Sequence, residues 1–354
     1  MSPLRILTFA IPFLFALAAC TGGEEPAPTP TPTPPFGLPP LVLPSDEEPH
    51  GFSTEWWYFN LHLTSREGER FTLHDVVFQV REPESGRSIY VRQTGLGDIA
   101  AGTHANAERL LTGQSASPAE ENGFLFEMGD WTMSGSDGES YQLQASSDGY
   151  SYALSLTDTT TPLLHGERGL VDFDFAGVSY YYSRPRLEVE GTLTTPDGRE
   201  IAVTGLGWLD KQWGDFQPVI IGWDWASVQL DDGTDVMLSR LFDMERNELH
   251  LYATVRGPGE EQEHIGPEGL EFTPLHERWT SPETGITYRT NWHVRIPAHD
   301  LEFTLVPLVE GSEFASQVLG VTYWEAGVDA IAPDGSTIGQ GFVELNWPRG
   351  AAAP

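Results

Sequence analysis

The strongest constraint on the fold is that the chain carries nearly the same pattern twice. Seven residues separate Trp56 from Leu63, and seven separate Trp223 from Leu230, with a glycine turn soon after each leucine. In both places an aromatic residue follows the tryptophan by two positions, and a strand-like apolar run follows the turn. The pattern predicts two related halves.

The segments that close the two halves also match. Each runs fourteen residues between two glycines, Gly191 to Gly205 and Gly327 to Gly341, with a Pro-Asp-Gly turn inside and a tryptophan beyond. A repeat of more than about 100 residues is too long for a solenoid unit. We therefore expect two domains, which a chain of 354 residues can accommodate with a core in each.

The N-terminus has the layout of an export signal. An apolar run over residues 6–16 is too short to span a membrane and leads into Leu17-Ala18-Ala19-Cys20. This tetrapeptide resembles a bacterial lipobox, which predicts a signal peptide over residues 1–20 and a lipid on Cys20. An ordinary signal peptide with an incidental cysteine is the alternative. Cys20 is the only cysteine, so a disulfide within one chain is impossible.

Residues 21–45 are dominated by proline and threonine. Such a segment cannot form a packed core and is typical of an extended, disordered tether. Anchor, tether and folded body together predict an exported lipoprotein in the periplasm, or at the outer membrane or cell surface. Its contact with the membrane is expected through the lipid alone.

The net charge of the chain limits the classes of partner that it can bind. The formal net charge is −33, from 52 acidic and 19 basic residues. A field of this sign repels phosphate backbones and disfavours a nucleic acid as partner. Lys211 is the single lysine among the bases. Nothing in the sequence predicts the oligomeric state.

Short strand-like runs, rich in Val, Thr, Tyr, Phe and Trp, fill most of the chain between Glu-Gly and Asp-Gly turn pairs. This pattern is typical of β-sandwiches and barrels, so the predicted fold class is all-β. Residues 100–111 and 313–319 are the best candidates for short helices. The domain boundary is placed after residue 218, giving an N-terminal domain over 46–218 and a C-terminal domain over 219–348.

Standard catalytic signatures are missing from the sequence. There is no Gly-x-Ser-x-Gly elbow, no His-Glu-x-x-His, no cysteine pair and no glycine-rich phosphate loop after a strand. The ten histidines are scattered without the spacing of metal ligands. We therefore expect neither a tightly bound metal nor a cofactor.

The densest cluster of polar and aromatic residues runs from Gly205 to Asp215 and contains Trp208, Asp210 and Trp213. A carboxyl in an apolar, aromatic site is favoured in its neutral form and can donate a proton near neutral pH. Asp210 is therefore a candidate proton donor. The alternative is a tight turn in which Asp210 caps backbone amides and the tryptophans fill the core.

Two further strand-like runs carry candidate residues. His74 shares one face of the run 71–80 with Val76 and Phe78, and we expect this face to point into a barrel. A hydrogen-bonded core histidine is the alternative. In the hydroxyl-rich run that follows Tyr180, Tyr182 and Arg184 are candidates to orient a substrate, with aromatic packing as the alternative.

Taken together and in order, five motifs resemble the carotenoid 1,2-hydratase and AttH-like proteins, many of which are described only as lipocalin-like or as secreted hydrolases. The motifs are Glu55-Trp56-Trp57-Tyr58, Tyr181-Tyr182-Ser183-Arg184-Pro185-Arg186, Trp208-Leu209-Asp210-Lys211-Gln212-Trp213-Gly214, Gly222-Trp223-Asp224-Trp225 and Tyr323-Trp324-Glu325. The resemblance covers residues 50–348. It implies two consecutive lipocalin-like β-barrels, with a ligand site at or between them.

The resemblance also bears on activity. The family includes enzymes that add water to a terminal double bond of carotenoid precursors, and relatives that bind polyenes. Hydratases often carry a histidine where this chain has Lys211, and this departure argues against a true carotenoid hydratase. Asp210 and Trp213 match the family motif, and Asp243 lies where a hydratase acid has been proposed.

The leading hypothesis is a lipid-anchored protein that binds a hydrophobic small molecule in a barrel cavity and catalyses acid-assisted hydration or isomerisation. The alternative is a carrier without catalysis, and a hydrolase ranks last because no nucleophile motif is present. The candidate catalytic residues are Asp210, His74 and Asp243. The candidate ligand-binding residues are Glu55, Trp57, Tyr58, Tyr182, Arg184, Trp208, Lys211, Trp213, Trp223 and Trp225.

Overall fold

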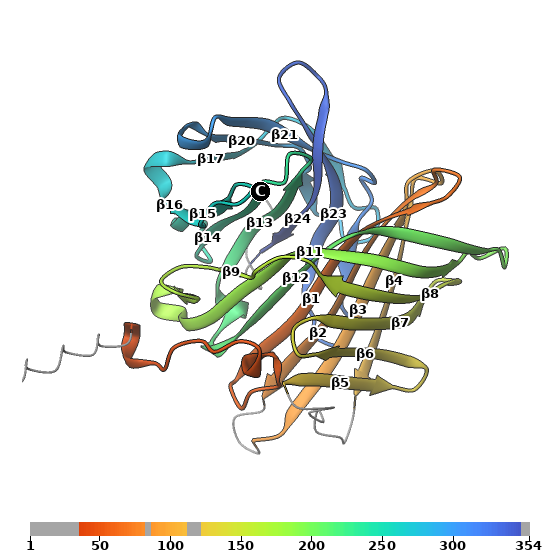
Figure 1. The fold of residues 1–354 in the computed structure, drawn as a ribbon, viewed down its shortest axis with the longest axis horizontal. Coiled ribbons are helices and arrows are strands. Elements are labelled where there is room, and N and C mark those ends of the chain that lie inside the picture. The colour runs from red at the N-terminus through yellow and green to blue at the C-terminus, as the bar shows by residue number, and fades with distance from the viewer. Residues whose placement is uncertain (1–34, 82–85, 112–121, 348–354) are drawn as a thin grey trace, which may run out of the picture.

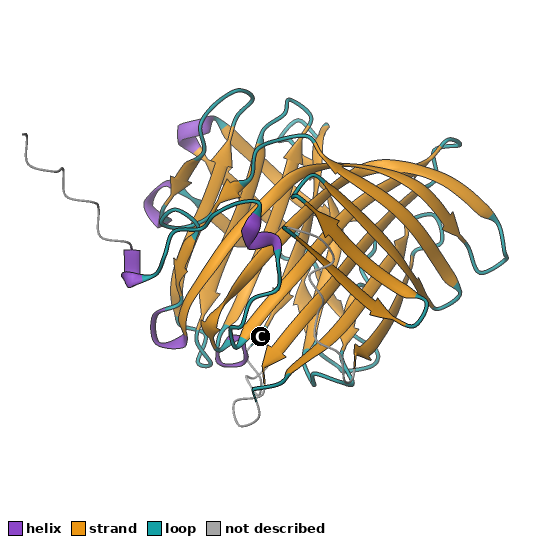
Figure 2. Ribbon diagram, turned by 60° about the horizontal axis from the view of Figure 1, so that its bottom comes forward, coloured by secondary structure: helices purple, strands orange, loops and turns teal. Residues whose placement is uncertain are grey.

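The computed structural model describes residues 35–81, 86–111 and 122–347. These residues fold into two curled antiparallel sheets, and no α-helix occurs among them (Figure 1, Figure 2). The predicted all-β class with two successive lipocalin-like barrels is confirmed. The predicted signal peptide, Cys20 and the greater part of the predicted tether lie outside the described residues.

The first sheet forms a barrel. Its twelve strands follow the order β4-β3-β2-β1-β12-β11-β8-β7-β6-β5, with β9 and β10 pairing with β11 off this path. Its strands are β1 (Thr54–Ser65), β2 (Arg70–Arg81), β3 (Ser88–Asp98), β4 (Thr103–Leu111), β5 (Gly123–Met128), β6 (Trp131–Ser136), β7 (Ser140–Ser147), β8 (Tyr150–Asp158), β9 (Leu163–Leu164), β10 (Leu170–Asp172), β11 (Gly177–Thr194) and β12 (Glu200–Phe216).

The second sheet is a more open half-barrel. Its strands follow the order β16-β15-β14-β13-β24-β23-β21-β20-β17, β22 pairs with β23, and β18 and β19 form a separate hairpin. The strands are β13 (Gly222–Leu230), β14 (Asp235–Phe242), β15 (Glu248–Arg256), β16 (Glu263–Ile265), β17 (Glu271–Pro274), β18 (Arg278–Thr280), β19 (Thr287–Arg289), β20 (Trp292–Ile296), β21 (Leu301–Pro307), β22 (Glu313–Ala315), β23 (Thr322–Ile331) and β24 (Thr337–Asn346).

The described helices are all short 3-10 turns. They are η1 (Pro35–Gly37), η2 (Ser45–Glu47), η3 (Asp174–Ala176), η4 (Pro218–Ile220), η5 (Pro267–Gly269) and η6 (Pro297–His299). The predicted domain boundary after residue 218 falls in the connection between the two sheets that contains η4. Within the described part of the chain, no helix has the length and apolarity needed to cross a bilayer.

Strand burial shows which walls face solvent. On β7 the side chains of Tyr141, Leu143 and Ala145 are buried, whereas Gln142 and Gln144 between them are exposed, as expected for a strand with one face in water. On β1, by contrast, ten of the twelve residues are buried, and on β12 every residue from 207 to 214 is buried. The second barrel covers the outer face of these strands, so both of their faces lie in an interior.

The sequence repeat corresponds to matching parts of the two sheets. In each sheet the first strand pairs with the last, β1 with β12 and β13 with β24. The two Pro-Asp-Gly turns join β11 to β12 and β23 to β24. Gly198 and Gly335 have φ angles of 84° and 88°, in the left-handed region where a side chain would be strained. The Pro-Asp-Gly turn of each repeat therefore requires glycine at its third position.

The barrels are joined by an apolar cluster between their outer faces. Strands β1 and β2 contact β23, and β1 also contacts β24. The cluster contains Trp208 and Phe216 from the first barrel and Trp225, Leu241 and Phe342 from the second. Burial of these large side chains stabilises the contact and fixes how the two barrels sit against each other.

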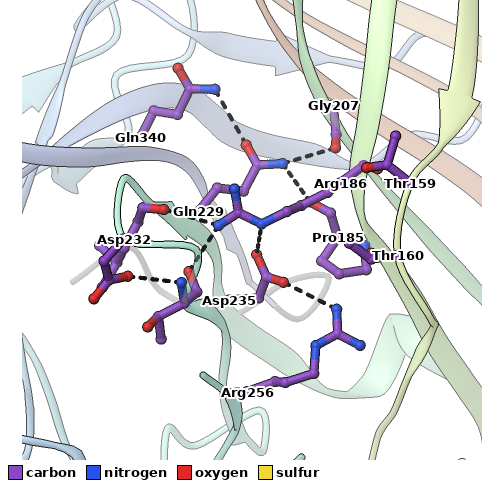
Figure 3. Close-up of polar contacts among 12 residues, drawn as sticks. Thr159, Thr160, Pro185, Arg186, Gly207, Gln229, Asp232, Asp235, Arg256 and Gln340 are labelled. Carbon is purple, nitrogen blue, oxygen red and sulfur yellow. Dashed lines mark hydrogen bonds and ion pairs between the residues drawn. The ribbon is translucent and has the colours of Figure 1, made fainter. Parts of the chain in front are cut away.

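Polar contacts fasten the same interface at one edge (Figure 3). The Arg186 guanidinium of β11 donates to Asp235 at 2.8 Å and to the Leu230 carbonyl at 2.9 Å. Gln229 of β13 donates to the Gly207 carbonyl of β12 at 2.9 Å. Because the bonds from Arg186 and Gln229 cross between barrels, we refer to these two residues and their partners as the interdomain clamp.

The N-terminal segment that precedes the first strand lies against the first barrel. Leu38, Leu41 and Leu43 pack onto a buried cluster that includes Tyr180 and Trp213. The Tyr180 hydroxyl also donates to the Pro39 carbonyl at 2.9 Å. The chain therefore packs against the barrel ahead of residue 46, where the folded domain was predicted to begin.

The two predicted short helices are wrong. Most of the first segment, 100–111, is β4, whose Ala105 is buried in the barrel core while its neighbours pair with β3. The second, 313–319, begins with β22, which pairs with β23. Alanine favours helices when a segment is isolated, but strand pairing and burial override that preference here.

Candidate functional site

A small cavity lies between the two barrels. Its volume is about 60 Å³, enough for a few water molecules, since one water needs about 10–15 Å³. Most of the wall is aromatic or aliphatic, and Asp210 and Glu344 are the two carboxyl groups in it. The lining residues are Trp56, Tyr58, Phe78, Phe173, Tyr181, Asp210, Gln212, Phe216, Ile221, Trp223, Trp225, Ser239, Leu241, Tyr252 and Glu344.

A second hollow lies next to the cavity and shares one wall residue with it. It has a volume of about 470 Å³ and is lined by Phe36, Leu170, Val171, Leu251 and Tyr252, among others. Tyr252 lines both spaces.

Asp210 is buried in the cavity wall and surrounded by hydrogen-bond donors. It lies on β12, in register with Ser183 on β11 and Tyr58 on β1. The Ser183 and Tyr181 hydroxyls donate short hydrogen bonds to its carboxylate, and the Trp208 indole donates a third at 2.6 Å. Asp210 is 6% exposed. Each donor comes from a strand that fixes its direction.

Burial and donors act on this carboxyl in opposite directions. Burial raises the pKa of Asp210 to about 6, while the hydrogen bonds from Ser183, Tyr181 and Trp208 lower it. A group with this pKa is present in both protonation states near neutral pH. Asp210 can therefore accept or donate a proton under ordinary conditions.

A buried chain of hydrogen bonds leads away from Asp210 into the second barrel. Ser183 Oγ lies 2.7 Å from His165 Nε2, and His165 Nδ1 lies 2.9 Å from the Thr254 hydroxyl. Burial lowers the pKa of His165 to about 3, so the ring is neutral. Because Ser183 donates to Asp210, His165 donates through Nε2 and accepts at Nδ1 from Thr254.

Two glutamates of the second barrel face the same interface. Glu325 on β23 and Glu344 on β24 are direct neighbours in register. Tyr58 donates a short hydrogen bond to Glu325, and Asn60 donates another at 2.7 Å. Glu344 reaches the cavity wall. Together with Asp210, the interface therefore holds three buried carboxyl groups.

Several predicted site residues meet at this cavity. Asp210, Tyr58, Trp223 and Trp225 line it directly, and the Trp208 indole bonds to Asp210. The Trp225 indole donates to the Tyr181 hydroxyl at 2.9 Å, so it supports one of the donors to Asp210. The sequence motifs of both halves thus converge between the barrels.

The sequence predicted that His74 points into the barrel, but the structure places it on the opposite face of β2. Leu73 and Val77 occupy the barrel core, while His74 faces the second barrel, 3.4 Å from Glu325. Burial and the nearby His104 lower the pKa of His74 well below its usual value, so it is neutral. The prediction failed because β2 is buried on both faces, and alternation alone does not tell which face is the lumen.

Four other predicted ligand-binding residues lie on the opposite side of the sheet from Asp210. Lys211 forms a short ion pair with Glu55, and its Nζ lies 3.9 Å from the Trp57 ring centroid and 4.7 Å from that of Trp213. All four are fully or almost fully buried. Because adjacent residues on a strand point to opposite faces, they cannot share a cavity wall with Asp210.

Tyr182 and Arg184 also lie away from the cavity. Tyr182 packs in the cluster with Trp213, and Arg184 donates to Glu47 at 2.7 Å and to Asp158 at 2.5 Å. These contacts tie the segment around η2 to the barrel. Neither side chain lines the interdomain cavity.

Asp243 lies in a turn and is not part of the site. Its carboxylate accepts hydrogen bonds from the backbone of Glu245 at 2.8 Å and of Asn247 at 2.9 Å. The bond from the Asn247 side chain, followed by that from its backbone, lowers the pKa of Asp243. This is a turn-forming aspartate between β14 and β15, which explains its position without a catalytic role.

Some residues of the site were missed by the sequence reading. Tyr181 and Ser183 were inside a quoted motif, and Glu344 stands as a charged residue among apolar ones on β24. His165 follows β9 in a loop and carries no sequence signal. Within the described ranges, no group of three or more His, Cys, Asp or Glu side chains is placed to hold a metal ion.

Comparison with known proteins places the chain among AttH-like proteins, whose family description matches residues 34–347. An AttH-type protein from Nitrosomonas europaea has a similar structure, with a TM-score of 0.78 and 26% identity over 90% of this chain and 99% of the other. No match was found among curated proteins.

Two more distant structures share the fold. Kievitone hydratase from Nectria haematococca has a TM-score of 0.70 at 18% identity, covering 87% of this chain and 93% of its own. CghA, solved with Sch210972, has a TM-score of 0.52 at 10% identity, covering 84% and 90%. At these identities the likeness extends to the fold alone.

Proposed function

Because this chain belongs to the AttH-like family, we propose that it binds a hydrophobic small molecule between its two barrels and catalyses proton-assisted hydration or isomerisation of it. The observation that carries the proposal is Asp210, a carboxyl buried in an aromatic cavity with a pKa raised to about 6 by burial. Water addition and double-bond migration both need such a proton-exchanging group beside an apolar substrate.

The cavity walls suit the charge that develops in such a reaction. Protonation of a double bond leaves positive charge on the neighbouring carbon, and aromatic faces attract positive charge. Trp56, Trp223 and Trp225 supply indole rings, and Tyr252 a phenol, around the carboxyl. A substrate larger than the cavity would reach the adjoining hollow, which shares the wall residue Tyr252 with the cavity.

A similar fold in a known hydratase supports hydration as the reaction. Kievitone hydratase, named for adding water to kievitone, shares the arrangement of two barrels. Kievitone is therefore a reasonable first substrate to offer this protein.

A carrier without catalysis remains the alternative function. The aromatic lining of the cavity, together with the hollow of about 470 Å³ beside it, would suit an apolar ligand held without reaction. The two functions differ in product. A carrier returns its ligand unchanged, whereas a hydratase returns it heavier by one water, and an isomerase returns it at the same mass with a shifted double bond.

The test begins with protein purified from its own host. Native mass spectrometry followed by solvent extraction identifies whatever is bound. The extracted molecule and kievitone are then incubated with the wild type and with Asp210→Asn, with Asp243→Asn as a matched control outside the cavity. We expect Asp210→Asn to lower turnover by about 10²–10⁴-fold, the usual effect of losing a proton-transfer group. Equal turnover by the wild type and Asp210→Asn would contradict the assignment of Asp210 as a proton-transfer group.

We also propose that the protein is exported and lipid-anchored at Cys20. The support is the Leu-Ala-Ala-Cys sequence behind an apolar run, followed by the Pro/Thr-rich segment. Metabolic labelling with a tagged fatty acid should mark the wild type and leave Cys20→Ser unlabelled. Labelling that survives this substitution would contradict the proposal.

A further inference from the structure

Two glutamates from the second barrel face each other beside the cavity without a cation between them. Glu325 and Glu344 lie opposite each other on the paired strands β23 and β24, and they are 1% and 8% exposed. Among the residues that the structure describes, neither forms an ion pair with a lysine or an arginine. A negative charge on one buried carboxyl group favours the protonated form of the other, so this pair retains a proton.

The groups that face this pair do not supply a positive charge either. They are Tyr58 from β1, His74 from β2, Asp210 from β12 and Tyr323 from β23. His74 is neutral because burial lowers its pKa well below the usual value. The two tyrosines and Asp210 are neutral or negative. Hydrogen bonds from Tyr58 and Asn60 to Glu325, and from Trp223 and Asn346 to Glu344, favour the ionised forms, whereas burial and the like charge of nearby carboxyl groups favour the protonated forms and outweigh them.

The pKa values of the pair move in the direction that this geometry requires. Burial raises the pKa of Glu344 to about 8, against hydrogen bonds from Trp223 and Asn346 that lower it, and the charge of Asp210 also acts to raise it. Burial and the charge of Glu344 raise the pKa of Glu325 well above its usual value. Of the two, Glu344 is the one that lines the cavity and can reach a ligand there.

Asp210 is paired in register with Tyr58 and Ser183, and not with a second carboxyl group. Its carboxylate accepts hydrogen bonds from Tyr181, Ser183 and Trp208, all of which favour the ionised form. Each barrel therefore contributes one carboxyl group to the cavity wall. The group from the first barrel is surrounded by donors, and the group from the second barrel sits beside another carboxyl.

We propose that Glu344, which lines the cavity and lies opposite Glu325 on the paired strands β23 and β24, is the proton donor of the site, and that Asp210 is the proton acceptor. This inference rests on the proposed function and names the residues of its two proton transfers. It moves the donor role, which the sequence suggested for Asp210, to the second barrel.

The two transfers balance for hydration. Glu344 gives its proton to one carbon of the double bond, a C–H bond forms from the π electrons, and the neighbouring carbon becomes positive. A water molecule then bonds to that carbon through oxygen, and its excess proton goes to Asp210. The proton returns from Asp210 to Glu344 through water in the cavity. In an isomerisation, Asp210 instead takes a proton from a carbon next to the cation.

Infrared spectroscopy tests the location of the proton without any substrate. At pH 7 exposed carboxyl groups are ionised, so the carbonyl stretch of a protonated acid reports buried groups. Glutamate labelled with carbon-13 at Cδ shifts a glutamic acid band and leaves aspartic acid bands in place. We expect a shifted band in the wild type and in Asp210→Asn. In Glu325→Gln the band of Glu344 should titrate at lower pH, because its like-charged neighbour is gone.

Two infrared outcomes would overturn the proposal. One is the absence of a glutamic acid band at pH 7 in the wild type. The other is a single unshifted band that disappears in Asp210→Asn, which would place the proton on Asp210. Glu188→Gln, a change on the exposed face of β11, serves as the control and should leave the spectrum unchanged.

Turnover separates this inference from the function on which it rests. With a substrate in hand, Glu344→Gln should lose about 10²–10⁴-fold in turnover, and the pH optimum of Glu325→Gln should move down. Full activity of Glu344→Gln would disprove the donor role while leaving the hydratase intact. Failure of the wild type on every substrate would instead contradict the proposed function and the donor role with it, and the infrared band would still report the proton that the pair retains.

Discussion

Trp56 and Trp223, the residues that open the two halves of the sequence repeat, stack on each other across the barrel interface. Their ring centroids lie 6.5 Å apart with the planes inclined by 26°. Both rings also line the cavity that holds Asp210. The two copies of the repeat therefore contact each other at the cavity, through the tryptophan that opens each copy.

Replacing either ring should weaken the interface. We expect Trp56→Leu and Trp223→Leu each to lower the free energy of unfolding by about 1–3 kcal/mol, since both rings are only partly buried. The double variant should fall short of the sum by about 0.5–1.5 kcal/mol, the coupling of a stacked pair. Denaturant unfolding measures these values. Trp279→Leu, away from this interface, should add to Trp56→Leu without coupling, and equal coupling in both pairs would contradict a specific stack.

The raised pKa of Asp210 predicts a pH-dependent stability. Its folded pKa of about 6 lies above its ordinary value of 3.8, so its contribution is fully present below pH 3.8 and is lost as the pH rises through 6. Asp210→Asn escapes this loss. The unfolding free energy of Asp210→Asn relative to the wild type should therefore rise by up to about 3 kcal/mol between pH 4 and pH 7.

Asp243→Asn is the control for that experiment and should show the opposite sign. The pKa of Asp243 is lowered, so its contribution is present above its ordinary value and is lost as the pH falls. Thermal unfolding of both variants at a series of pH values checks the prediction. The same pH trend in the two variants would mean that burial does not raise the pKa of Asp210.

The interdomain clamp should hold the two barrels in one cooperative unit. Arg186→Gln removes the charged donor to Asp235 and the Leu230 carbonyl, and should cost about 2–3 kcal/mol. We expect calorimetry to show one transition for the wild type and two for Arg186→Gln. Arg199→Gln removes exposed ion pairs with Asp197 and Glu69 and should cost no more than about 1 kcal/mol. Comparable losses from the two changes would argue against a special role for the clamp.

Lys211 should matter for stability because it is buried against a carboxylate. Lys211→Met leaves Glu55 buried without the cation, and should cost about 3–5 kcal/mol. Lys211→Met combined with Glu55→Gln should recover part of that loss. Denaturant unfolding of the two single variants and the double variant checks this, with Arg66→Met on the surface as the control. A Lys211→Met protein as stable as the wild type would show that the pair is not buried as described.

The fold could be predicted because its signals are local and repeated. Turn pairs such as Asp197-Gly198 and Asp334-Gly335 require left-handed glycines, and these ended strands where expected. Strand length and spacing then gave an all-β chain in two halves. The short β4 was missed because its alanines suit a helix in isolation, and its pairing with β3 is set by residues elsewhere in the chain.

The site was harder to predict because the sequence gives the alternation of a strand but not its phase. His74 was placed in the barrel lumen and Trp57 at the ligand, whereas the structure places each on the other side of its strand. On strands with one exposed face, polar residues would have fixed the phase. Here the second barrel buries the outer face, and that contact depends on the whole tertiary structure. Glu344 carried a weak signal, and His165 none.

Strand β12 separates the space between the barrels from the interior of the first barrel. Asp210 presents a carboxyl to the space between the barrels, and the next residue, Lys211, sends its ammonium group to the other side of the same strand. A slip of one residue in the pairing of this strand would exchange the two groups. A relative with the same two barrels but this strand shifted by one residue would therefore present an ammonium group, in place of a carboxyl group, to the space between its barrels.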